Sequence, residues 1–535
     1  MMQDMILLLL LPMALLVVVG SLLRRAPPFK EMQTRLAAAK WALVRDFSAA
    51  LRQDVVVTDR VTAHHLLVRG GAGGAFCNRP PTSAASSVLS RQRHHNISSA
   101  PYGPLWRGIR RNLVSEVFHP SRLRVYAPAR RRALCGLVAD LREQCTSANG
   151  GVALAAESIH AALFGLSTTM CFGDGVDPGR VRAMADGMED LIRSLVGLRV
   201  FAALPALTEL IYRDRWNNLV ALRRQQEEMY LPLINARRDR RRRPSGEAPT
   251  YVDTLIDLLV VDDSHSRSSS GSGNASKLSL TDGELVGLCS EFLGAGTEPA
   301  TAALQWIMAN LVKHLDVQEA VRREIDRMVG ADAEEVNEED LGKLEYLHAV
   351  LMEALRLHPT VPSVSRQRAT HPRAYIVKRN HGSGASWTKT HDEEVTVPVM
   401  PDDHVFLDGH RVVAGTTVQF LLERLARDKT VWAEPDKFLP ERFLAGGGGD
   451  GTSLVAAAGS AGEIKMMPFG AGRRMCPGMG VAMLHLGYFV ANLVREFEWT
   501  EAEGDLAIDL ESQVRFLNVM KRPLRAQLAL RKKEA

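Results

Sequence analysis

The chain has 535 residues, of which 46% are hydrophobic and 24% are charged, and its formal net charge at pH 7 is +5. A charge this balanced over this length argues against a nucleic-acid partner, and the apolar content is enough for one large core or several smaller ones. The six cysteines lie scattered without C-x-x-C spacing, which excludes a disulfide framework and a zinc site and is typical of a reducing compartment.

The N-terminus opens with an apolar stretch, and residues 5–23 carry no charge. At about 1.5 Å per residue, this stretch is long enough to cross the apolar core of a bilayer. Arg24 and Arg25 follow it directly, whereas a cleavable signal carries its positive charge ahead of the apolar run, so a retained anchor is favoured over a signal peptide. We expect a transmembrane anchor over residues 1–23 and a basic linker over residues 24–54, and the positive-inside rule places the rest of the chain in the cytosol.

Residues 55–58 predict a strand, and residues 59–69 predict a helix. A further helix begins near Tyr102 and carries Trp106 and Arg110, which are four residues apart and therefore share one helical face. By itself, such a pair is more often part of a packed surface than of a binding site. Further amphipathic helices are expected at Leu154–Met170, Val181–Leu204 and Arg215–Arg243.

The longest helical pattern runs from Thr281 to His314, and Thr281 and Glu284 have the spacing of a capping box. Pro299 lies in its middle, directly after Glu298. Because proline lacks an amide N–H, we expect the helix to kink or open near Ala295 and Gly296. An acid at such a break suits a site for oxygen and water, and a kink that serves packing alone is the equally supported alternative.

A helix over Leu341–Leu357 carries Glu353 and Arg356 among apolar neighbours, which indicates that this pair is buried. The polar, basic segment Val364–Val399 is expected to be an insertion, and an unspliced intron is a second explanation for it. Farther along, Val405–Phe420 predicts a hairpin.

The most informative stretch surrounds one cysteine and reads F-x-x-G-x-R-x-C-x-G, with Phe469, Gly472, Arg474, Cys476 and Gly478 in register. A cysteine that binds metal must be a thiolate, and a thiolate is stabilised by neighbouring cations, amide donors and a following helix N-terminus. A structural cysteine in a basic turn is the alternative, and five specified positions within ten residues disfavour it.

These motifs, in this order, resemble the cytochrome P450 family, most closely its plant microsomal A-type members near the families numbered 77 and 89. The resemblance implies a mainly α fold with a small β region, in which residues 55–535 form a single haem domain behind the membrane anchor. It makes Cys476 the axial ligand of haem b (iron protoporphyrin IX), with Phe469 packed under the ring.

The same resemblance implies a propionate site and an oxygen site. Trp106, Arg110 and Arg474 would reach the haem propionates, and Gly472 and Gly478 would shape the ligand loop. Ala295 and Gly296 would border the oxygen site, with Glu298 as the proton-relay acid. This chain departs from the family where Pro299 replaces the usual alcohol, so Thr301 or an ordered water is the substitute.

Two further implications concern structure. Glu353, Arg356 and Arg442 would form a buried ion triad that locks the region carrying Cys476. The segment from Phe76 to Ser99 would help to shape the pocket.

The implied function is oxidation of a small lipophilic substrate with O2, using electrons from NADPH through NADPH–cytochrome P450 reductase at the endoplasmic reticulum membrane. Two alternatives stay open: an isomerase or dehydratase that needs no relay alcohol, and a degenerate haem-binding protein without turnover.

Overall fold

The computed structural model describes most of the chain beyond the N-terminal segment. The described residues are 55–69, 76–80, 96–146, 151–195, 201, 205–241, 249–261, 277–330, 333–368, 375–377, 395–397, 405–407, 410–412, 415–447, 453–460, 462–502 and 507–531. They all belong to the unit Gln53–Ala535. The expected anchor and basic linker lie outside them. Within the described ranges, no helix combines the length and the apolar character that a bilayer crossing needs.

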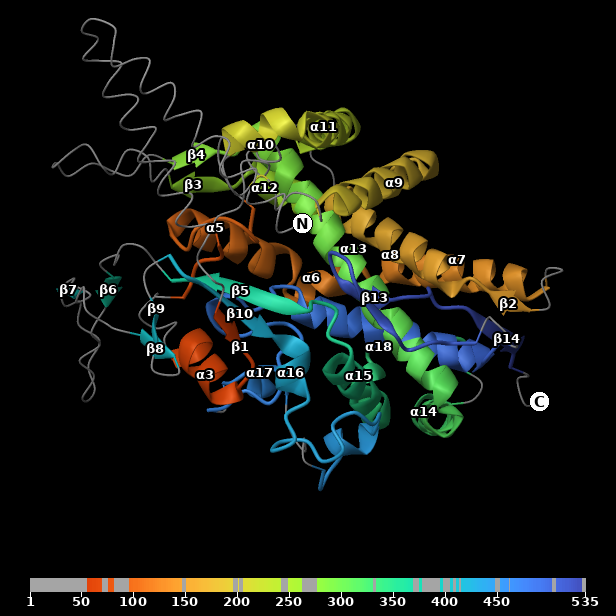
Figure 1. Ribbon diagram of the computed structural model, residues 1–535. Helices are drawn as coiled ribbons and strands as arrows, with labels where there is room; N and C mark the ends of the chain where they lie inside the picture. The colour runs from red at the N-terminus through yellow and green to blue at the C-terminus, as the bar shows by residue number, and fades with distance from the viewer. Residues whose placement is uncertain are drawn as a thin grey trace, which may run out of the picture. The chain divides into compact units, whose positions relative to one another are not determined.

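Helices dominate the described part of the chain, which confirms the mainly α prediction (Figure 1). The longer ones are α5 (Pro104–Asn112), α7 (Ala127–Thr146), α8 (Ala155–Phe172), α9 (Pro178–Leu195), α11 (Arg213–Arg241), α13 (Asp282–Lys313), α14 (Leu315–Val329), α15 (Glu345–Leu357) and α18 (Met479–Glu496). The shorter ones are α3 (Arg60–His64), η1 (His65–Arg69), η3 (Leu113–Val117), α6 (Pro120–Val125), α10 (Pro205–Ile211), α12 (Tyr251–Ile256), η5 (Leu341–Lys343), α16 (Leu422–Ala426), η6 (Pro440–Phe443), α17 (Leu454–Ala457) and η7 (Gly472–Arg474).

The long helix α13 forms the centre of the packing. Its N-terminus carries the predicted capping box, in which the Thr281 hydroxyl accepts from the Glu284 amide and the Glu284 carboxylate accepts from the Thr281 amide at 2.8 Å. The helix packs against α8, α11, α15 and α18, and most of its residues are buried. Figure 1 shows it crossing the described unit, with α18 and α15 beside its lower half.

The expected opening of this helix is not seen, because α13 is helical without interruption across Pro299. The physical reason is burial: tertiary contacts on both sides of Pro299 hold the turn, although one intrahelical hydrogen bond is missing. The bond that proline cannot make would have ended on the carbonyl of Ala295, so this carbonyl is left without its ordinary helical donor.

The β region consists of small sheets. One three-stranded sheet has the order β1 (Val55–Val57), β10 (Thr417–Leu421), β5 (Ser363–Gln367), and another the order β11 (Phe497–Thr500), β14 (Ala526–Leu530), β2 (Val152–Ala153). Two-stranded pairs complete it: β3 (Leu259–Val261) with β4 (Lys277–Ser279), β6 (Tyr375–Val377) with β7 (Val395–Val397), β8 (Val405–Leu407) with β9 (His410–Val412), and β12 (Ser512–Val514) with β13 (Asn518–Met520).

Strand β5 corrects the expected start of the insertion. Val364 pairs with Phe420 and Arg366 with Val418 in an antiparallel register, so residues 364–367 belong to the sheet. The neighbouring strand β10 fixes its position, since its residues Phe420 and Val418 are fully buried. The predicted hairpin is confirmed by the pairing of β8 with β9.

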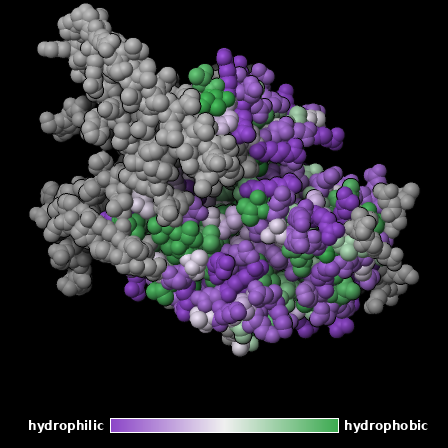
Figure 2. All heavy atoms as spheres, viewed as in Figure 1, coloured by the Kyte–Doolittle hydropathy of each residue, from purple (hydrophilic) through white to green (hydrophobic). Residues whose placement is uncertain are grey.

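The core is one large apolar cluster around α8, α13, α15 and α18, with two smaller clusters near β10 and Trp432. On the face seen in Figure 2, hydrophilic residues cover most of the described surface and the hydrophobic ones form separate groups.

Candidate active site

The cysteine loop is a tight turn whose glycines take conformations that other residues avoid. Gly470 and Gly472 have φ angles of +73° and +68°, in the left-handed region that favours glycine. A Cβ on Gly472 would lie 2.1 Å from the carbonyl oxygen of Leu67, so no side chain fits there. The amide of Cys476 donates to the carbonyl of Phe469 at 2.9 Å, which closes the loop and places the thiol just before α18.

Cys476 combines an accessible residue with a partly enclosed thiol. The residue is exposed, yet burial raises the pKa of its thiol. The amide of Gly478 and the charges of Arg110 and Arg79 lower that pKa and favour the thiolate. A cation bound to the sulfur would therefore add to the stabilisation of the thiolate that these neighbours begin.

The predicted tryptophan–arginine face is assembled beside this loop. Trp106 is buried and donates from Nε1 to the carbonyl of Ile97 at 2.9 Å. The guanidinium of Arg110 lies 5.3 Å from the centre of its ring and donates to the carbonyl of Met475 at 2.6 Å. Arg474 stacks on the same ring at 4.3 Å. Trp106 and Arg110 from one sequence motif and Arg474 from another thus form one contact group.

The family resemblance implies that Arg474 pairs with a haem propionate, but the hydrogen bonds it makes in the structure go to backbone carbonyls. Its guanidinium donates to the carbonyls of Cys77 at 2.8 Å, Ile97 at 3.2 Å and Ala100 at 2.6 Å. These bonds use three of its five N–H donors and tie the segment around residues 77–100 to the cysteine loop.

Two further arginines join this site that the sequence reading did not identify. Arg366, on β5, is 2% exposed, and burial together with the charges of Arg79 and Arg474 lowers its pKa to about 9. The same causes, burial and then the charge of Arg79, lower the pKa of Arg474 to about 10. Burial also lowers the pKa values of Arg79 and Arg110. We name Arg79, Arg110, Arg366 and Arg474 the arginine cluster.

The arginine cluster offers positive charge to an anion: Arg366 and Arg474 are buried, Arg110 is half-buried, and Arg79 is exposed with the charge of Glu291 near it. Among the residues that the structure describes, none of Arg110, Arg366 and Arg474 forms an ion pair with a carboxylate. Buried cations that repel one another are stabilised by a negative partner, and a porphyrin carries two propionates. The donor set, a thiol that Arg110 and Arg79 act on and two further guanidinium groups in the same cluster, therefore fits a haem. Neither Arg79 nor Arg366 belongs to a short sequence motif. Arg366 lies in the segment Val364–Val399, which was expected to be an insertion.

The predicted oxygen-site residues lie on α13. Ala295 and Gly296 are exposed although α13 is otherwise largely buried, so they border open space. Thr301 is buried, and its hydroxyl has no hydrogen-bond partner among the described residues. Glu298 bonds instead toward α8, where its Oε1 lies 3.0 Å from Nε2 of His160.

Aromatic and polar contacts connect α13 to the cysteine loop. Phe292 of α13 stacks on Phe118 with ring centres 6.0 Å apart, and the ring of Phe118 lies against Gly478. The carboxylate of Glu291 accepts from the amides of Ile97 and Ser98 at 2.7 Å each. The end of the segment Phe76–Ser99 is thereby fixed to α13, whereas residues 81–95 lie outside the described part.

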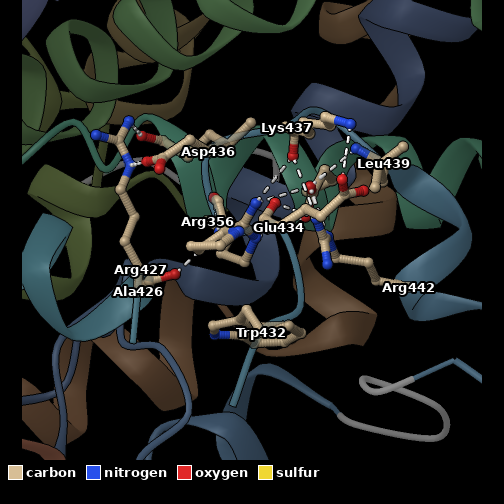
Figure 3. Close-up of polar contacts among 12 residues, drawn as sticks. Arg356, Ala426, Arg427, Trp432, Glu434, Asp436, Lys437, Leu439 and Arg442 are labelled. Atoms are coloured by element: carbon tan, nitrogen blue, oxygen red, sulfur yellow. Dashed lines mark hydrogen bonds and ion pairs between the residues drawn. The ribbon is translucent and has the colours of Figure 1, made fainter. Parts of the chain in front are cut away.

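The buried triad is present as expected (Figure 3). Glu353 accepts from Arg356 at 2.7 and 2.8 Å, from Arg442 at 3.1 Å and from the amide of Leu439 at 3.0 Å. Glu353 and Arg356 are fully buried. Arg356 also donates to the carbonyls of Ala426 and Pro435.

Figure 3 shows Trp432 below the triad, and its Nε1 donates to the carbonyl of Lys465 at 3.2 Å. The guanidinium of Arg356 lies 5.4 Å from the centre of the Trp432 ring. Trp432 thus connects the triad to the chain just before the cysteine loop, which is the structural role predicted for these residues.

The sequence model of the family described as Cytochrome P450 matches residues 15–372 and 397–530. The residues between these two ranges, 373–396, fall inside the segment expected to be an insertion.

Among curated relatives, "Cytochrome P450 89A9" of Arabidopsis thaliana is 35% identical over 90% of this chain and 85% of its own length. "Cytochrome P450 78A9" of the same plant is 28% identical over 85% of this chain and 75% of its own length. "Pluviatolide synthase" of Sinopodophyllum hexandrum is 26% identical over 89% of this chain and 83% of its own length. These relatives confirm the expected kinship with plant A-type members.

Solved structures agree in fold. A zebra fish cytochrome P450 with progesterone superposes with a TM-score of 0.65 at 20% identity, covering 89% of this chain and 93% of its own. A cyanobacterial CYP120A1 with retinoic acid bound gives 0.64 at 22% identity, covering 88% of each chain. The cysteine loop, helix α13 and these matches lead to one conclusion: the chain belongs to the cytochrome P450 family and is a haem monooxygenase.

Proposed function

We propose that this monooxygenase binds haem b through Cys476 and oxidises a small lipophilic substrate with O2 and electrons from NADPH. The observation that carries the proposal is the exposed Cys476 in its glycine turn, with Arg110 and Arg79 acting on its thiol. Haem held there would supply the oxygen-activating chemistry, as it does with thiolate ligands elsewhere.

The residues around the sulfur have distinct roles in this proposal. Gly472 and Gly478 give the loop its shape, and the amide of Gly478 holds the thiolate form of Cys476. Phe469 would pack under the haem ring, and its carbonyl accepts the Cys476 amide. Trp106 orients Arg110 and Arg474, and the arginine cluster neutralises the propionates.

On α13, Ala295 and Gly296 leave room for O2 because they have little or no side chain. Glu298 holds the proton to be delivered, and Thr301 is the hydroxyl that lies one helical turn beyond it. The substrate would lie beside the segment Phe76–Ser99, which Glu291 holds against α13.

Electrons would arrive from NADPH–cytochrome P450 reductase at the basic surface outside the cysteine loop. Arg107, Arg111 and Arg473 are exposed there, and acidic redox partners are steered by such charge. The apolar residues 5–23 would anchor the chain in the endoplasmic reticulum membrane by a single N-terminal span, with the catalytic domain in the cytosol. Membrane fractionation of the full chain against a variant lacking residues 1–23 tests this placement.

The test of the haem site is the carbon monoxide difference spectrum of the reduced protein. A thiolate-ligated haem gives a Soret band near ~450 nm, and we expect the full chain to show it and Cys476→Ala to lack it. The same band in Cys476→Ala would refute the ligand assignment.

Pro299 favours a second candidate function, because an isomerase or dehydratase acting on a peroxide needs no relay alcohol. Conversion of an organic hydroperoxide without NADPH and reductase would support that candidate. Substrate oxidation that depends on NADPH, reductase and O2 would support monooxygenation. A protein with the ~450 nm band but without either reaction would be the degenerate haem binder.

A further inference from the structure

The side chain of Glu298 has a defined partner on the neighbouring helix. Nε2 of His160, on α8, lies 3.0 Å from Oε1 of Glu298, on α13. The two side chains are 26% and 20% exposed, so the pair lies between bulk solvent and the buried part of α13. Among the described residues, His160 is the side chain that forms a hydrogen bond with the Glu298 carboxylate.

The charges around His160 favour its protonated form. Burial lowers the pKa of the imidazole, but the hydrogen bond and charge of Glu298, with Glu189 and Asp186 from α9, outweigh it and leave the pKa raised. Glu189 and Asp186 are exposed. The imidazole therefore feels the charge of two exposed carboxylates of α9 in addition to its hydrogen bond with Glu298.

Other hydroxyl groups near Glu298 are not arranged as a relay to solvent. Pro299 has no hydroxyl at all. The Thr297 hydroxyl donates to Ser167 at 3.1 Å, and both are buried. The Thr301 hydroxyl is buried and has no hydrogen-bond partner among the described residues. Among the described side chains, the one that is hydrogen-bonded to Glu298 and also partly exposed is therefore His160.

We propose that His160 is the positioning residue that holds Glu298 in place and replenishes its proton from bulk solvent. The inference rests on the proposed role of Glu298 as the relay acid. The proton on Nε2 of the imidazolium moves to Oε1 of Glu298, which gives a neutral imidazole and a neutral carboxyl group. Glu298 releases its proton into the pocket, and the imidazole takes another from water beside Asp186 and Glu189. No electrons are exchanged in this step.

The direct test is the titration of His160 itself. The full chain is labelled with 13C at Cε1 of histidine, reduced and saturated with carbon monoxide, and the His160 signal is assigned by its loss in His160→Gln. We expect its pKa to lie above 6.5, the ordinary value, and to fall in Glu298→Gln. Equal pKa values in both proteins would overturn the proposal, whether or not the enzyme turns over.

The second test follows protons through the oxidase reaction, for which no organic substrate is needed. With NADPH, reductase and O2, full proton delivery forms water and consumes two NADPH per O2, whereas poor delivery forms hydrogen peroxide and consumes one. Because positioned proton transfer contributes 10²–10⁴-fold to rates, we expect His160→Gln to lower the ratio of water to peroxide by about tenfold or more. In the unmodified chain this ratio should fall as pH rises through the His160 pKa, and His160→Gln should remove that dependence.

His160→Gln keeps a hydrogen-bond donor for Glu298 but cannot carry a titrating proton, so it separates tethering from proton supply. His348→Gln is the matched control, because His348 is exposed on a different helix, α15, and should leave the ratio unchanged. An unchanged ratio in His160→Gln, with the ~450 nm band retained, would overturn the proposal. If no variant consumed NADPH, the proposed monooxygenation would fail instead, and the titration would still decide the role of His160.

Discussion

Removing the charge of Glu353 tests whether the buried triad supports the cysteine loop. In Glu353→Gln, Arg356 and Arg442 stay buried, at 0% and 9% exposure, without the carboxylate that accepts three of their N–H groups. Breaking a buried ion pair by changing one partner costs about 3–5 kcal/mol. Part of the hydrogen bonding survives in the glutamine carbonyl, so we expect the lower end of this range.

The expected change in melting temperature follows from the size of the unit. Unfolding entropy is about 2.1 cal/mol/K per residue, which for the unit Gln53–Ala535 gives about 1 kcal/mol/K. A loss of about 3–5 kcal/mol therefore lowers the melting temperature by about 3–5 °C. Because Trp432 connects the triad to Lys465, just before the cysteine loop, the haem site should fail with it.

The assay heats the haem-loaded protein and follows two signals, the far-ultraviolet circular dichroism and the ~450 nm band of samples withdrawn, reduced and treated with carbon monoxide. Glu434→Gln is the matched control, because Glu434 lies in the same segment but pairs with Lys437 at the surface. Such exposed pairs contribute little. If Glu353→Gln melted within the difference shown by this control, the reasoning about the buried triad would be wrong.

Four further results are expected. Gly472→Ala should lower the yield of haem-loaded protein several-fold in expression trials, because the residue has φ +68° and a Cβ would meet the Leu67 carbonyl; a normal yield would contradict the loop geometry. Arg366→Met should weaken haem binding about tenfold in a hemin titration without lowering the melting temperature of the haem-free protein, because it removes a repelled buried cation. Pro299→Thr should lower the hydrogen peroxide formed per NADPH, since it restores both the alcohol and the donor for the Ala295 carbonyl; an unchanged yield would show that neither matters. The pKa of His160 is higher in the folded protein than its ordinary value of 6.5, so protonated His160 stabilises the folded state. This contribution is complete below pH 6.5 and is lost as the pH rises through the folded-state pKa. His160→Gln should therefore lower the melting temperature more at pH 5.5 than at pH 8.5.

Local sequence determined the parts of this protein that depend on neighbours along the chain. The capping box at Thr281 and Glu284, the glycine-rich turn before Cys476 and the face shared by Trp106 and Arg110 follow from backbone geometry over a few residues, and all three are found as predicted. The triad joins Glu353 to a residue 89 positions away, so its third member came from the family resemblance rather than from spacing.

Only the tertiary structure decided the features that join distant single residues. Arg79 and Arg366 carry no motif, yet chain packing brings them near Arg474, where their charges help to lower its pKa and that of Arg366. His160 and Glu298 are 138 positions apart, and nothing in either local sequence indicates that they meet. The continuity of α13 through Pro299 was likewise beyond local reasoning, because burial against neighbouring helices outweighs the loss of one hydrogen bond.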